Sequence, residues 1–285
     1  MKQVILTTFI LASLTAQDNF VGETFEKGSI NYADRTIQAT GIGFIPVNVI
    51  NAGQARRSAM RIAKQDALRQ LIEIVNGVNV TSETTVSGAM FDDVIKTQVQ
   101  GAIRGARKVG EPKYLSDTSV EVVYEVSMSN ISRALLPMVE RAPVLSYESV
   151  TATGTAAAAG GQGGGAAAAP ASGGVTGIII DGSGLGLRPA MSPRILNQSG
   201  TVLYGPGQYD RDYAAANGVV GYAKTLGQAK ADTRVQGNPL VLRGASASGT
   251  AKTDVIISNA DAGKLVSAGR SAGLLQDCRI MFVLN

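Results

Sequence analysis

The densest group of ionisable side chains in the C-terminal half is the segment YDRDY at residues 209–213. Asp210 and Asp212 could hold a cation if both lay on a loop, because hard divalent cations prefer carboxylate oxygens. Arg211 stands between them, which favours a surface charge pair instead. The remaining acids, tyrosines and lysines of this half are scattered along the sequence. We therefore predict no catalytic constellation and no metal site.

Histidine is absent from the sequence, and there is one cysteine, Cys278. The absence of histidine removes the commonest general base and every Ser-His or Cys-His dyad. A single cysteine excludes an internal disulfide and a multi-cysteine zinc site. The neighbours of Cys278, QDCRIMFVLN, read as a buried final strand, so we interpret it as a core thiol. We expect a protein that is not an enzyme and binds no cofactor; a hydrolase is disfavoured.

A glycine-rich segment, GSGLGLRP, follows an apolar strand pattern that ends at Asp181. Such a turn can hold phosphate when a helix begins next, because the helix N-terminus presents free amides. Pro189 and Pro193 follow instead, and the glycine spacing departs from that of dinucleotide-binding turns. We therefore interpret the segment as a tight turn. If this half binds a ligand, Asp181 is the residue to test first.

The N-terminus, MKQVILTTFILASLTAQ, has the three-part layout of a secretory signal peptide. Lys2 is followed by an apolar run from Val4 to Leu14 and by small residues that end at Ala16. The run is shorter than the roughly 20 residues of a membrane-spanning helix. We predict a signal peptide over residues 1–16 and a periplasmic protein; the alternative is a buried N-terminal strand or helix. No cysteine near the cleavage region could carry a lipid anchor.

A long amphipathic helix is predicted over residues 51–77, after a strand over residues 35–46. Asn51 can cap its start and Gly77 can end it. One narrow apolar stripe contains Met60, Ala63, Ala67, Leu71 and Ile74.

Three cations line one shoulder of this helix: Arg57, Arg61 and Lys64. They could dock an acidic partner, and the alternative is that they are a solvated helix edge.

The rest of the predicted first domain, residues 18–150, alternates between strand and helix patterns. Residues 78–86 have the alternation of a strand, residues 91–109 suit a short helix that runs into a strand near Ile103, and residues 117–130 form a clear strand. A last helix over residues 131–139 is interrupted by Pro137.

Three runs in this region carry a resemblance: ARRSAMRIAKQDALRQLIEIVNGVNVTSETTV, DVIKTQVQGAIRGARKV and SVEVVYEVSMS. In this order and spacing, over about residues 50–130, they resemble a bacterial envelope family. The family includes small outer-membrane lipoproteins, the N-terminal domain of flagellar assembly protein T and the flagellar basal-disk P protein. The resemblance implies a helix packed on a small antiparallel sheet, and non-enzymatic work in assemblies at the outer membrane. The lipoprotein members carry a lipidated cysteine that this chain lacks.

Residues 151–174 are rich in alanine and glycine and have no charge, so nothing offsets the entropy of ordering them. We predict a flexible linker that spans about 25–30 Å and lets one domain be fixed while the other finds a partner; the alternative is an unselected insertion. Residues 175–285 then form a second domain. The order of its strand and helix patterns predicts an α/β or α+β domain with a mixed sheet.

Together these observations predict a two-domain α+β protein. We expect an exported, non-enzymatic assembly component of the envelope, associated with the flagellum at the outer membrane. Expected partners are envelope or flagellar basal-body proteins and further copies of the chain, with peripheral contact to the outer membrane and no nucleic acid. The alternative is a soluble periplasmic module that binds a ligand such as a cell-wall fragment.

Overall fold

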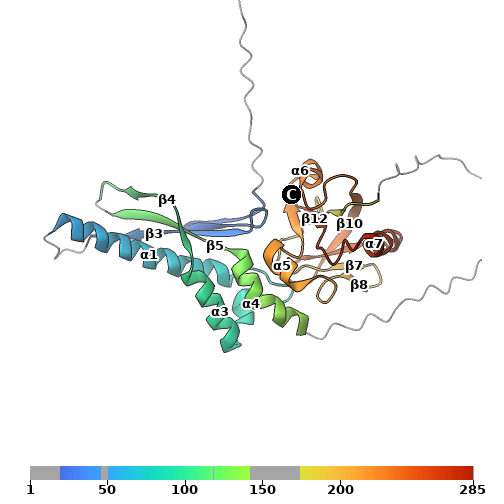
Figure 1. Cartoon of the computed structure of the whole chain (residues 1–285), viewed down its shortest axis with the longest axis horizontal. Helices are drawn as coiled ribbons and strands as arrows, with labels where there is room; N and C mark the ends of the chain where they lie inside the picture. The colour runs from blue at the N-terminus through green and yellow to red at the C-terminus, as the bar shows by residue number, and fades with distance from the viewer. Residues whose placement is uncertain (1–19, 46–50, 118, 142–173, 285) are drawn as a thin grey trace, which may run out of the picture.

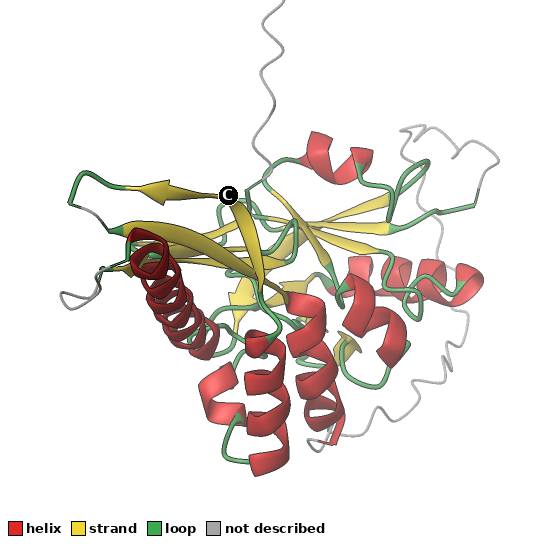
Figure 2. Ribbon diagram, turned by 60° about the vertical axis from the view of Figure 1, so that its left-hand side comes forward, coloured by secondary structure: helices red, strands yellow, loops and turns green. Residues whose placement is uncertain are grey.

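The computed structural model describes residues 20–45, 51–117, 119–141 and 174–284. The predicted signal peptide lies outside these ranges, as does the predicted linker except for Gly174. The described residues form two sheets with helices against them, which confirms the α+β class (Figures 1 and 2). Residues 20–141 are called the N-terminal part below, and residues 174–284 the C-terminal part.

The N-terminal part contains a five-stranded antiparallel sheet in the order β1-β2-β3-β5-β4. Its strands are β1 (Gly22–Phe25), β2 (Gly28–Asn31), β3 (Thr36–Gly43), β4 (Arg107–Tyr114) and β5 (Val120–Ser127). Helix α1 (Ala52–Asn76) runs along one face of this sheet and packs on β3 and β5 (Figure 2). As predicted, the Asn51 side chain accepts hydrogen bonds from the backbone N–H groups of Gly53 and Gln54, and Gly77 ends the helix.

Small residues let α1 approach β3 closely. Gly41 and Gly43 on the strand face Ala59, Ala63 and Ala67 on the helix, and all three alanines are fully buried. A Cβ atom on Gly41 would stand 2.1 Å from the carbonyl oxygen of Ala63. Backbone therefore lies against backbone here, and neither element has room for a larger side chain.

Replacing Gly41 with alanine is expected to lower the free energy of unfolding by about 1–3 kcal/mol, because the methyl group must push α1 away from the sheet. The control is Gly101→Ala in the interior of α3, where a Cβ meets nothing within 4 Å. That variant is expected to be stabilised by about 0.5–1 kcal/mol. Urea unfolding measures both, and equal stability of the two variants would contradict the close packing.

Three further helices complete the N-terminal part: α2 (Val86–Ala89), α3 (Asp93–Arg104) and α4 (Met128–Arg141). The predicted change from helix to strand near Ile103 is confirmed, since α3 ends at Arg104 and β4 begins at Arg107. The strand predicted over residues 78–86 is wrong. Residues 78–85 form a loop with a single bridge between Asn79 and Thr85, and Val86 begins α2. Their alternating apolar pattern arises from side chains that are buried in tertiary contacts rather than from a sheet.

The C-terminal part contains the predicted mixed sheet, in the order β8-β7-β11-β10-β6-β12-β9. Parallel pairs join β6 to β10 and to β12, whereas β10 and β11 are antiparallel. The strands are β6 (Ile178–Asp181), β7 (Ile195–Asn197), β8 (Val202–Tyr204), β9 (Gly221–Ala223), β10 (Leu240–Ser248), β11 (Asp254–Ile257) and β12 (Ile280–Val283). The helices are α5 (Arg211–Asn217), α6 (Leu226–Ala231) and α7 (Asn259–Ala272).

Helix α7 is capped by Ser258, whose hydroxyl accepts from the N–H of Asp261. Cys278 is fully buried directly before β12, so its side chain is a core thiol as expected.

The two parts pack against each other through a shared apolar core. Helices α4 and α5 lie side by side (Figure 1). The rings of Tyr32 and Tyr222 meet edge to face with centroids 5.8 Å apart. The expectation that a tether leaves two independently moving domains is therefore wrong for these residues, because separating the parts would expose a continuous apolar surface to water.

Candidate functional site

The loop at residues 78–85 connects the two parts through the backbone. The carbonyl oxygens of Asn79 and Val80 accept hydrogen bonds from the N–H groups of Met191 and Ser192, at 2.9 and 2.8 Å. The carbonyl oxygen of Ser82 accepts from the N–H of Ala251 at 3.0 Å. The loop thus pairs with two separate segments of the C-terminal part.

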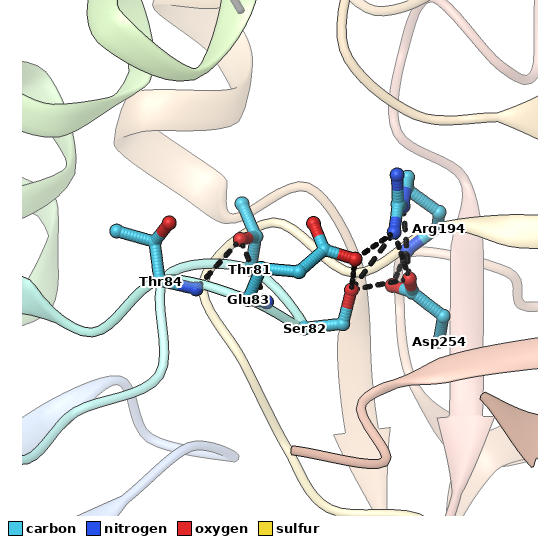
Figure 3. Close-up of polar contacts among 6 residues, drawn as sticks. All are labelled: Thr81, Ser82, Glu83, Thr84, Arg194 and Asp254. Atoms are coloured by element: carbon cyan, nitrogen blue, oxygen red, sulfur yellow. Dashed lines mark hydrogen bonds and ion pairs between the residues drawn. The ribbon is translucent and has the colours of Figure 1, made fainter. Parts of the chain in front are cut away.

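A polar cluster lies at the end of this loop (Figure 3). The Ser82 hydroxyl donates to Oδ2 of Asp254 at 2.7 Å, and Nε and Nη2 of Arg194 donate to the same oxygen at 2.8 and 2.6 Å. Arg194 also reaches Glu83, with Nη2 3.0 Å from Oε1. The side chain of Asp254 is 1% exposed. A buried carboxylate with a full set of donors is stable only while those donors stay in place, so the cluster fixes how the two parts pack.

The contacts of Arg194 in this cluster also shift the pKa of its guanidinium. Burial by itself would lower the pKa of its guanidinium, but the hydrogen bond and the charge of Asp254, together with Glu83, outweigh burial and raise it. Ser82 is no candidate nucleophile, because its oxygen is buried and its donor is directed at carboxylates rather than at an open cleft.

A second connection joins the parts at the C-terminal end of α5. Arg35 of the N-terminal part donates to the carbonyl oxygens of Ala215 and Ala216, and Arg234 donates to those of Asn217 and Gly218. The last carbonyls of a helix lack partners within the helix, and cations are favourable there. Burial, together with the neighbouring charge of Arg234, lowers the pKa of Arg35 to about 10. Arg35 therefore stays charged at neutral pH.

Asp181 and the glycine-rich turn have a local structural role. Asp181 ends β6 and accepts a hydrogen bond from the N–H of Ser183 at 3.1 Å. Its pKa is lowered, mainly by hydrogen bonding to Ser183 and also by the nearby charge of Arg243, whose Nη1 is 3.5 Å from Oδ2. Gly184 and Gly186 both have positive φ in the turn, and no helix follows. The tight-turn interpretation is confirmed.

The aspartates of the YDRDY segment do not share a loop. Asp210 caps α5 by accepting from the N–H of Tyr213 at 2.7 Å, and Asp212 lies in the first turn of that helix. Among the residues that the structure describes, no three potential metal ligands gather in one place.

A small open pocket of about 190 Å³ lies beside α5. It is lined by Tyr213, Asn217, Asp232, Thr233, Arg234 and Arg279. The guanidinium of Arg234 is already used by backbone carbonyls, including that of Cys278 at 2.7 Å. Arg279 is exposed and donates to the carbonyl oxygen of Thr176 at 3.3 Å. The pocket is therefore polar, and the exposed side chain of Arg279 is the lining cation that can change its contacts.

The predicted shoulder of α1 is exposed as expected: Arg57, Arg61 and Lys64 all lie on the surface. Lys64 approaches the ring of Tyr124 on β5, with Nζ 5.8 Å from the centroid, and Arg56 lies over the ring of Tyr114 on β4 at 4.9 Å. We call Arg56, Arg57, Arg61 and Lys64 the basic face. Within the described part of the chain, no carboxylate forms an ion pair with any of these four residues.

Sequence reasoning missed the polar cluster and the role of Arg35, because each joins residues more than 100 positions apart. One signal was available: Asp254 opens the apolar strand DVII, and an aspartate inside a buried strand needs a partner. No helix in the described ranges has the length and apolar character that crossing a membrane requires.

Comparison with known proteins gives one finding for the C-terminal part. Residues 177–285 match the family model of the second domain of Treponema pallidum Tp0624. The match begins close to the predicted domain boundary at residue 175. No curated protein matches the chain.

Proposed function

We propose that this protein is a non-enzymatic structural component of the bacterial envelope, exported to the periplasm, that assembles with envelope or flagellar basal-body proteins at the outer membrane. The observation that carries the proposal is the basic face, where Arg57 and Arg61 are exposed and no described carboxylate neutralises them. The envelope and flagellar setting is supported by the resemblance of residues 50–130, and the non-enzymatic role by the absence of histidine.

The basic face is well suited to a docking role because its backbone is held firmly. Helix α1 is 25 residues long, and its alanine stripe lies directly on β3, so the four cations project from a supported element rather than from a loop. A group of like charges without local counterions attracts an acidic surface and orients it on approach. We therefore expect the partner's contact surface to be acidic.

The double variant Arg57→Glu/Arg61→Glu is expected to lose association with the envelope fraction at low salt and to keep its fold. Exposed charges contribute about 0–1 kcal/mol to stability, so the melting temperature should change little. The difference from the unchanged protein should shrink at high salt, because screening weakens interactions between exposed charges. Co-sedimentation with envelope fractions at two salt concentrations measures this.

The matched control is Lys224→Glu/Lys230→Glu, which makes the same change of charge at exposed positions of the C-terminal part. Its association should equal that of the unchanged protein. If both double variants co-sediment equally well at low salt, the basic face is only a solvated helix edge.

The pocket beside α5 favours a second candidate function, a periplasmic module that binds a ligand such as a cell-wall fragment. Arg279 and Tyr213 would contact an anionic, hydroxyl-bearing group there. Calorimetric titration with an anionic muropeptide tests this candidate. Saturable binding that is lost in Arg279→Ala would support this second function. The absence of any heat of binding would rule it out.

A further inference from the structure

The N-terminal part exposes two apolar side chains at the junction of α2 and α3. Phe91 is 93% exposed and Val94 is 65% exposed. The cause is local: α3 buries Ile95, Val99 and Ile103 on its inner face, which leaves the residues at its start outside the core. Isolated exposed apolar residues are common, but a phenylalanine exposed to this degree is available to bury against another surface.

Two carboxylates flank Phe91 on its C-terminal side. Oδ1 of Asp92 accepts hydrogen bonds from the N–H groups of Val94 and Ile95, and Asp93 occupies the first turn of α3. Within the ranges that the structure describes, no lysine or arginine forms an ion pair with either aspartate. We call residues 91–94 the acidic corner.

The basic face has the complementary chemistry. Its four cations lie within about 12 Å along α1, at 1.5 Å per residue. The ring of Tyr114, 55% exposed, and the partly buried ring of Tyr124 lie beneath Arg56 and Lys64. Helix α1 packs on β3 and β5, so the edge strand β4 that carries Tyr114 extends beyond it. A phenylalanine with two carboxylates thus matches tyrosine rings with cations, in both polarity and charge.

The two surfaces lie at different places in the N-terminal part. Arg56 of the basic face lies over Tyr114 at the end of β4, whereas the acidic corner precedes α3, whose 12 residues span about 18 Å before the chain reaches the start of β4. We propose that the acidic corner of one copy of this chain docks on the basic face of a second copy. We infer one corner–face contact between each pair of copies, which is a heterologous arrangement, so a complex of two copies keeps one free corner and one free face. This proposal rests on the proposed function, since it names a further copy of the chain as an acidic partner of the basic face.

The experiment uses sedimentation velocity of the full exported chain over a range of concentrations. The unchanged protein is expected to form species larger than a dimer as concentration rises, and to dissociate at high salt. A protein that stays monomeric throughout, or that stops at a dimer, would overturn the proposal.

Two blocked variants make the test specific. Arg57→Glu/Arg61→Glu blocks the face, and Phe91→Ser/Asp93→Lys blocks the corner while keeping Asp92, which caps α3. Each alone is expected to be monomeric, with self-association weakened by about tenfold or more. An equimolar mixture is expected to form dimers and nothing larger, because one free face and one free corner remain. Thermal melting of each variant checks that it is folded.

Three outcomes contradict self-docking: a blocked variant that still self-associates, a mixture that stays monomeric, and a mixture that forms larger species. The proposed function fails separately, by the co-sedimentation assay. If Arg57→Glu/Arg61→Glu no longer co-sediments with the envelope fraction but the unchanged protein is a monomer, the partner is a different acidic protein. The self-docking inference alone is then wrong.

Discussion

Replacing Asp254 with alanine is expected to lower the free energy of unfolding by about 3 kcal/mol, near the low end of the range for breaking a buried ion pair. The substitution removes the buried acceptor of the Arg194 guanidinium and the Ser82 hydroxyl at the junction of the two parts, and leaves them only the exposed carboxylate of Glu83. The low end is expected because the Arg194 side chain is 29% exposed and can recover part of its hydration. Urea unfolding followed by circular dichroism measures the loss.

The matched control for this prediction is Arg243→Ala, which breaks the ion pair to Asp181 in the same part of the chain. The Arg243 side chain is 74% exposed, so water replaces its partner and the expected loss is below about 1 kcal/mol. If Asp254→Ala and Arg243→Ala had equal effects, the buried cluster would not hold the two parts together.

A larger effect is expected from Leu71→Asp, which places a carboxylate in the apolar stripe of α1. Leu71 is fully buried within the apolar core. An unpaired buried carboxylate costs several kcal/mol, a large fraction of the stability of a whole domain, which is typically about 5–15 kcal/mol. We expect Leu71→Asp to unfold the N-terminal part, seen as loss of the cooperative transition.

The neighbouring position supplies the control, since Ile72 lies on the same helix but at its outer side and is 36% exposed. Ile72→Asp is expected to cost only about 1 kcal/mol or less, as for other surface substitutions. If Leu71→Asp cannot be produced, Leu71→Ala is expected to lose about 2–5 kcal/mol through the cavity it leaves. Equal stability of the Leu71 and Ile72 variants would mean that the stripe is not the packed face.

Local patterns in the sequence predicted most of the elements. The α1 boundaries follow from Asn51 and Gly77 because a cap and a helix end depend on residues within one turn. The strand at residues 78–86 was predicted wrongly because alternation reports burial of every second side chain, and the loop buries Val78, Val80 and Ser82 without pairing in a sheet.

The candidate site could be predicted only where its residues lie close together in the sequence. The basic face follows from the helical spacing of Arg57, Arg61 and Lys64, and that spacing was visible. The stacking of Arg56 on Tyr114 was not, because it depends on which strand edge lies beside α1. The packing of the two parts depends on Arg35, Arg194 and Asp254 meeting distant residues, and no local pattern specifies such contacts.

Photo-cross-linking in cells tests most directly whether the basic face contacts a partner. A photoreactive phenylalanine analogue at position 61 places the probe on the exposed side of α1, and the same analogue at the exposed position 230 on α6 is the control. We predict a cross-linked product of higher mass from position 61 that disappears when Arg57→Glu is added. A protein that remains uncross-linked at position 61, or gives the same product from position 230, would contradict this contact.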